Sequence, residues 1–172
     1  MPFQKKIEIG IPQALPGTPA SSEPQRYAGN RLAGPGIRIG RFVFAAPPGV
    51  ENRDFVYPSA PAEGTSPIGF VRYQLTYYDT DIASPGTMNI REGSEVAVAV
   101  SGDFWAEVPE TAAEGDWVFA SETDGTIKTA AGFDAAIEGY VATSWRITET
   151  GENGLAVISN GVGALALKTV GE

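Results

Sequence analysis

Two short stretches decide the fold of this chain: GRFVFA at residues 40–45 and GDWVFA at residues 115–120. Each begins with glycine, which tolerates a tight backbone at the start of a strand, and continues with the aromatic residues and valine that favour strands. Each is followed, after a variable loop, by a similar sequel, GFV at 69–71 and GYV at 139–141. We therefore expect two comparable β units in one core, with internal duplication as one explanation and chance recurrence as the other.

The remaining strand signals extend this pattern along the chain. Apolar and β-branched runs recur about every 8–12 residues, separated by Pro, Gly, Asn-Gly and Asp-Gly turns. The predicted strands are 37–45, 54–57, 69–78, 94–102, 103–108, 116–120, 139–148, 155–159 and 164–170. Residues 129–137 are the one place where a helical turn is expected. The sequence predicts an all-β domain over 37–172, a compact β-sandwich or small barrel.

An extended arm is predicted over residues 1–36. Residues 12–36 contain five prolines and four glycines, a composition typical of arms and linkers. About 35 extended residues reach on the order of 100 Å, enough to cross a neighbouring subunit. The alternating stretch KKIEIGI at 5–11 reads as a half-buried strand. It either adds to the sheet edge of another subunit or folds back as an edge strand of its own domain, and the long linker favours the first reading.

Charge is divided unevenly between the two parts. Residues 1–46 carry a net charge of +4, and the remaining residues carry −13, for −9 overall. An acidic body repels nucleic acids and anionic lipids, so neither is an expected partner. We expect the basic leader to bind protein.

The composition excludes several function classes. The chain has no cysteine and no histidine, which removes disulfides, thiolate metal sites, the usual catalytic triads and the commonest zinc ligand. No cofactor is expected. The N-terminus lacks the apolar core of a signal peptide, and no apolar run is long enough to span a membrane, so synthesis in the cytoplasm is expected.

Two residue sets could still carry chemistry. Paired carboxylates are the only catalytic apparatus available, and they are better explained as a solvated acidic face: Asp79, Asp81, Asp103, Glu107 and Glu110. Tryptophans could form a sugar-binding platform, although on strands they more often fill a core or interface: Trp105, Trp117 and Trp145. A carbohydrate-binding β-sandwich of a phage tail or a secreted protein is therefore the alternative function.

A resemblance to a known family rests on several strand starts. PIGFV at 67–71, the GxxVxV pattern at 93–98, GDFWA at 102–106 and the later GDWVFA stretch are arranged along the chain as in the capsid decoration, or structural cement, proteins of tailed phages. The resemblance covers roughly residues 30–150 and includes the Pro/Gly-rich leader. It is a pattern of strands and contains no catalytic signature.

This resemblance implies a non-enzymatic virion protein on the outer surface of the phage head. Such a protein would bind the major capsid protein where capsomers meet and would self-associate, as a homotrimer rather than a dimer. The residues expected to contact the capsid or a neighbouring subunit are Phe3, Lys5, Lys6, Ile7 and Ile9, supported by Arg26, Tyr27 and Arg31. Removal of residues 2–36 is expected to leave a folded domain that no longer binds heads.

Overall fold

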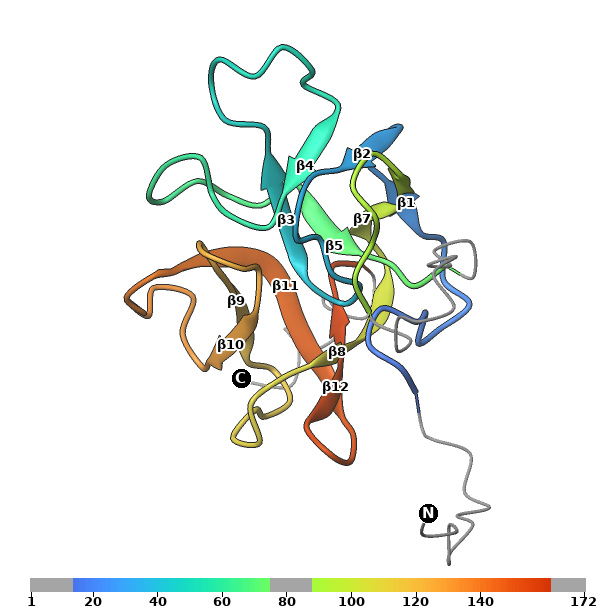
Figure 1. The fold of residues 1–172 in the computed structure, drawn as a ribbon. Helices are drawn as coiled ribbons and strands as arrows, with labels where there is room; N and C mark the ends of the chain where they lie inside the picture. The colour runs from blue at the N-terminus through green and yellow to red at the C-terminus, as the bar shows by residue number, and fades with distance from the viewer. Residues whose placement is uncertain (1–13, 75–87, 162–172) are drawn as a thin grey trace, which may run out of the picture.

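The computed structural model describes residues 14–74 and 88–161, which form two β-sheets (Figure 1). The larger sheet has seven strands in the order β1-β7-β5-β3-β4-β2-β6, and the smaller has five in the order β10-β9-β11-β12-β8. The strands are β1 (Arg26–Tyr27), β2 (Arg31–Ala33), β3 (Phe42–Ala45), β4 (Phe55–Tyr57), β5 (Gly69–Val71), β6 (Glu95–Val96), β7 (Val98–Ser101), β8 (Asp103–Glu107), β9 (Trp117–Ser121), β10 (Ile127–Ala130), β11 (Tyr140–Thr150) and β12 (Leu155–Ser159). The predicted all-β sandwich is confirmed.

The larger sheet curls so that its two ends meet. Arg26 pairs with Ser101 and Arg31 pairs with Val96, both antiparallel, with a register shift between Arg26 and Tyr27. Because β1 runs on towards β2 and β6 towards β7, these pairs form a single interrupted ladder that joins both ends of the sheet. The inner face of the curl encloses a small aliphatic core: Ala33, Ile37, Ile39, Val43, Val56, Val71, Ile90, Val96 and Val98.

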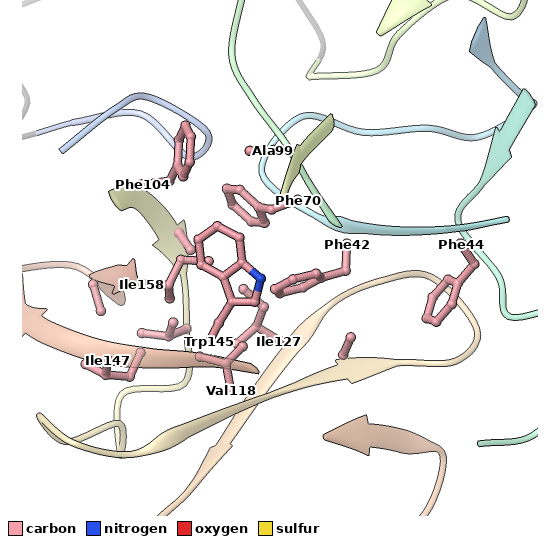
Figure 2. Packing of buried hydrophobic residues seen from close by; sticks show 14 residues of the cluster. Phe42, Phe44, Phe70, Ala99, Phe104, Val118, Ile127, Trp145, Ile147 and Ile158 are labelled. Carbon is pink, nitrogen blue, oxygen red and sulfur yellow. The ribbon is translucent and has the colours of Figure 1, made fainter. Parts of the chain in front are cut away.

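A second, aromatic core joins the two sheets (Figure 2). Trp145 of β11 lies at its centre, with ring centroids 6.1 Å from Phe42, 6.2 Å from Phe70 and 6.1 Å from Phe104. Phe42 also meets Phe70 edge-on at 5.4 Å. All four side chains are buried. Rings at these separations pack in the tilted and edge-to-face geometries that aromatic pairs prefer, so this cluster holds the sheets together.

The two similar stretches turn different positions of their shared pattern towards the aromatic core. In β3, Phe42 and Phe44 face the aromatic core while Val43 faces the aliphatic core. In β9, the residues that face the aromatic core are Val118 and Ala120, one position out of step. β3 pairs antiparallel with β5, which contains the GFV stretch, and β9 pairs antiparallel with β11, which begins within the GYV stretch. The two pairs have different registers. The two units are therefore similar in topology and differ in the faces that their residues present.

The glycines that open these stretches have the role expected of them. Gly40 and Gly115 have φ angles of 75° and 90°, a region that side-chain-bearing residues rarely adopt. The charged residues that follow these glycines, Arg41 and Asp116, have different partners. The Arg41 Nη1 lies 2.9 Å from Asp124 Oδ2 in the turn between β9 and β10, whereas Asp116 Oδ2 accepts a hydrogen bond from the Ala113 N–H. The charge reversal thus reflects two separate turns.

Several elements differ from the sequence-based expectation. Strands β1 and β2 were not predicted, because they lie in the Pro/Gly-rich leader. The helical turn predicted at 129–137 is wrong, because residues 129–130 belong to β10 and residues 131–137 contain no helix. The predicted strands at 5–11 and 164–170 both lie outside the described residues. No helix in the described ranges is long and apolar enough to cross a membrane.

Candidate functional site

Residues 14–36 follow the sheet edges as an extended segment. The N–H of Gly17 donates to the Trp105 carbonyl at 2.7 Å, and the Trp105 N–H donates to the Thr18 carbonyl at 2.9 Å, so this segment covers the outer edge of β8. The N–H of Tyr73, after β5, donates to the Gly17 carbonyl at 2.8 Å. The segment therefore closes the side of the sandwich by bonding to both halves. The division of the chain into an arm, residues 1–36, and a domain, residues 37–172, stays a prediction.

A buried carboxylate anchors this segment. Asp103 on β8 is only 8 % exposed, and its Oδ2 accepts a hydrogen bond of 2.6 Å from the Ser21 hydroxyl. The prediction that Asp103 belongs to a solvated acidic face is therefore wrong, since buried charges are retained where polar partners meet them. Glu107 and Glu110 are exposed, as expected of a solvated face. Asp79 and Asp81 lie outside the described residues.

Two of the predicted contact residues lie together on the exposed strand β1. Arg26 and Tyr27 are both exposed, and the Tyr27 hydroxyl accepts a hydrogen bond of 2.7 Å from Arg72 Nη1 and donates to Gln25 Oε1. The Arg72 guanidinium carbon also lies 5.6 Å from the centre of the Tyr27 ring. This group, Gln25, Arg26, Tyr27 and Arg72, is called the β1 ridge. It presents two cations and an aromatic ring, a composition enriched at protein interfaces.

The other predicted contact residues have different fates. Arg31 is half-buried on β2 between two paired strands, and its Nη1 donates to the Arg53 carbonyl at 3.4 Å. Five predicted contacts lie outside the described residues: Phe3, Lys5, Lys6, Ile7 and Ile9. The structure therefore brings Arg26 and Tyr27 together and places Arg31 apart from them. Sequence reasoning missed Arg72, which lies 45 positions from Tyr27 and carries no local signal.

The three tryptophans do not form a common platform. Trp145 is 3 % exposed in the aromatic core, and Trp105 is half-buried on β8. Trp117 lies on the outer face of β9, where the Arg146 guanidinium covers its ring at 4.1 Å and Phe133 meets it edge-on at 4.9 Å. A sugar platform needs exposed, coplanar ring faces, and this arrangement offers none.

A hollow between the two sheets is lined by apolar and uncharged polar residues. This hollow of about 280 Å³ lies where β11 bulges away from β9, and none of its lining side chains is ionisable. Its lining residues are Phe42, Ser66, Pro67, Ile68, Gly69, Val100, Phe133, Ala142, Thr143, Ser144, Trp145 and Asn160. Within residues 14–74 and 88–161, no three acidic side chains cluster as metal ligands would. These surfaces suit contact with another protein better than chemistry.

The carboxylate of Asp124 has a lowered pKa and a structural role. Burial raises the pKa of Asp124, but hydrogen bonds from the side chains of Thr126 and Ser121 and from the Thr126 backbone, together with the Arg41 cation, outweigh burial and hold this pKa below its usual value. Asp124 therefore stays ionised and joins the β9–β10 turn to the start of β3.

Comparisons with known proteins agree with this picture. Residues 3–160 match the model of a family described as structural cement protein (E217 gp24/Pam3 gp6). A solved chain from "The capsid of Myoviridae Phage XM1" has the same fold, with a TM-score of 0.66, 16 % identity, and coverage of 94 % of this chain and 99 % of that chain. No curated protein matches the sequence.

The family match spans nearly the whole described fold, including both sheets and the segment along β8. The structural match supports the fold alone, because its identity is low. The chain therefore belongs to the structural cement protein family of tailed phages and is a non-enzymatic component of the phage capsid.

Proposed function

We propose that this protein binds the outer surface of the phage head, at the junctions between capsomers, and strengthens the shell by joining major capsid proteins. The observation that carries this proposal is the extent of the family match, residues 3–160, which includes the N-terminal leader as well as both sheets. The leader and the domain thus belong to one cement unit. A cement protein needs broad contact surfaces, and the edges and ridges of this fold provide them.

The N-terminal leader is the proposed anchor. Its candidate contacts are Phe3, Lys5, Lys6, Ile7 and Ile9, which precede the described residues, and Arg26 and Tyr27 on the β1 ridge. Residues 1–46 are basic on an otherwise acidic chain, so the leader suits acidic surfaces of capsid protein or of a neighbouring copy. An extended segment of this kind contacts a large area per residue, at the cost of its ordering entropy.

Self-association would multiply these contacts. In a homotrimer, three arms act at one capsomer junction, and each bound arm raises the effective concentration of the others. We therefore propose a trimer, for which light scattering should give three times the chain mass of 18.1 kDa. Neither nucleic acid nor membrane is a proposed partner, because residues 47–172 are strongly acidic.

The experiment is binding to expanded heads that lack the protein, followed by sedimentation. The full chain should sediment with the heads, and a chain without residues 2–13 should bind much more weakly while its circular dichroism spectrum is unchanged. A matched variant with Lys5 and Lys6 both changed to Gln tests the charge contribution alone. Equal binding by the truncated chain would refute the anchor. Electron cryomicroscopy of decorated heads would show whether the protein lies outside the shell.

The truncation is placed at residue 13 for a structural reason. Removal of residues 2–36 would also delete β1, β2 and the pairing along β8, so a stable remainder is no longer expected. The shorter deletion leaves these ladders intact.

A further inference from the structure

Among the described residues, the outer edge of β10 has no paired strand. The five-stranded sheet ends at β8 on one side and at β10 on the other, and residues 17–20 cover the β8 edge. β10 pairs with β9, and within residues 14–74 and 88–161 no other segment pairs with its outer side. Free strand edges are templates for an additional strand, and native proteins usually cover or blunt them.

The register of β10 shows which backbone groups are available. The Ser121 N–H donates to the Thr126 carbonyl at 2.8 Å, and β10 continues this antiparallel pairing with β9. Because hydrogen-bonded residues alternate along such a ladder, the N–H and C=O groups of Ile127 and Thr129 point away from β9. The side chain of Lys128, which could have blocked the edge, instead lies over the Tyr140 ring at 4.3 Å.

A hollow beside the start of β10 adds specificity. Its volume is about 220 Å³, and its lining residues are Gly40, Arg41, Glu107, Val108, Thr126 and Ile127. Val108 and Ile127 contribute apolar residues to its lining and Glu107 an acidic one, while the lining cation, Arg41, is already paired with Asp124 at 2.9 Å. An incoming strand with a branched apolar side chain and a neighbouring cation would match both features.

We propose that the outer edge of β10 binds residues 5–11, KKIEIGI, from a neighbouring copy as an added strand. In this segment Ile7, Ile9 and Ile11 share one face, and Lys5 and Lys6 supply cations for a carboxylate such as Glu107. The 13 residues before residue 14 extend to about 45 Å, enough to reach another molecule. Backbone hydrogen bonds supply affinity and the alternating side chains supply specificity, as in other cases of strand addition.

This inference rests on the proposed self-association and specifies its contacts. Every copy carries one donor segment and one acceptor edge, so the interface is heterologous. Heterologous interfaces that close form rings, and a ring of three copies would satisfy every segment and every edge.

Cysteine cross-linking tests the pairing directly, because the chain has no cysteine of its own. Full-length chains carrying Ile9→Cys and chains carrying Thr129→Cys are mixed and oxidised. We expect disulfide-linked heterodimers, and none when Thr129→Cys is replaced by Glu51→Cys on a distant exposed loop. Absence of the heterodimer overturns the proposal. So does a monomeric cross-linked product as the main species of the Ile9→Cys, Thr129→Cys double variant, because the segment would then dock on its own chain.

A backbone variant provides the second test. Thr129→Pro removes an N–H that points away from β9, so the β9–β10 pairing survives, whereas Thr129→Val keeps the N–H. The proline variant should weaken self-association about tenfold, the effect of losing one backbone hydrogen bond, while the valine variant should not. Equal association by both variants overturns the proposal. If the wild-type protein sediments with heads but the Ile9→Cys and Thr129→Cys chains form no heterodimer, this inference alone is refuted. If the cysteine variants cross-link but the wild-type protein does not bind heads, the proposed function is refuted.

Discussion

The turn between β9 and β10 packs against the start of β3, and substitution of Gly125 tests that contact. Gly125 has a φ angle of 67°, and its carbonyl accepts a hydrogen bond of 3.0 Å from the Phe42 N–H. A Cβ atom built on Gly125 would lie 2.9 Å from the carbonyl carbon of Phe42 and closer still to its oxygen. Gly125→Ala therefore forces the turn away from β3.

The magnitude follows from two separate costs. A left-handed backbone costs alanine about 1–2 kcal/mol. Withdrawal of the turn also breaks the Phe42 hydrogen bond and leaves a buried donor without its partner, which costs about 1–3 kcal/mol more. Gly139 has a similar φ of 73°, but a Cβ there would have no atom within 4 Å, so Gly139→Ala pays only the first cost. The difference between the two variants isolates the packing of the turn.

The assay is urea denaturation monitored by tryptophan fluorescence, because Trp145 lies in the core that the turn packs against. Gly125→Ala should be less stable than Gly139→Ala by about 2 kcal/mol, which corresponds to roughly 4–8 °C in melting temperature for a chain of this size. Equal destabilisation by the two variants would refute the reasoning, because the left-handed backbone would then account for the whole effect.

Three further predictions concern the leader, the turn charge and the core. Removing residues 2–13 should leave cooperative melting intact, because it leaves the described strand pairings in place, whereas removing residues 2–36 should abolish cooperative melting. Folding lowers the pKa of Asp124, so its ionised form stabilises the protein above the unfolded pKa, and this stabilisation is lost as pH falls through the folded pKa. Between about pH 6 and pH 3, the urea midpoint of the Asp124→Asn variant should therefore fall less than the urea midpoint of the wild type. Phe70→Ala should cost about 3–5 kcal/mol by urea denaturation, and Phe133→Ala, 48 % exposed, less than about 1 kcal/mol; similar costs would contradict the assigned core.

The fold class was predictable because apolar and β-branched runs separated by clear turn signals recur along the chain. β9, β11 and β12 match their predicted ranges closely, and the turn at 123–126 lies where Asp-Gly indicated it. β1 and β2 escaped prediction for a physical reason. They have two and three residues, too few for periodicity, and their partners lie far along the chain: β7 for β1, and β4 and β6 for β2.

The core that each strand residue faces, and the contacts of surface residues, were harder to predict. The sheet that contains β3 has cores on both of its faces, so Phe42 and Val43 are both buried and the alternation that usually marks an inner face is lost. The burial of Asp103 depends on Ser21, 82 positions away, and no local pattern signals it. The β1 ridge was half predicted, since Arg26 and Tyr27 were named without Arg72.

The most direct test of the central claim is the rupture temperature of phage heads with and without this protein. DNA-filled heads that lack it are incubated with the purified full chain, and DNA release is followed with an intercalating dye during heating. If the protein is a cement on the outer surface, bound protein raises the rupture temperature in a saturable manner. Heads that bind the protein but rupture at an unchanged temperature would contradict the proposed cement function.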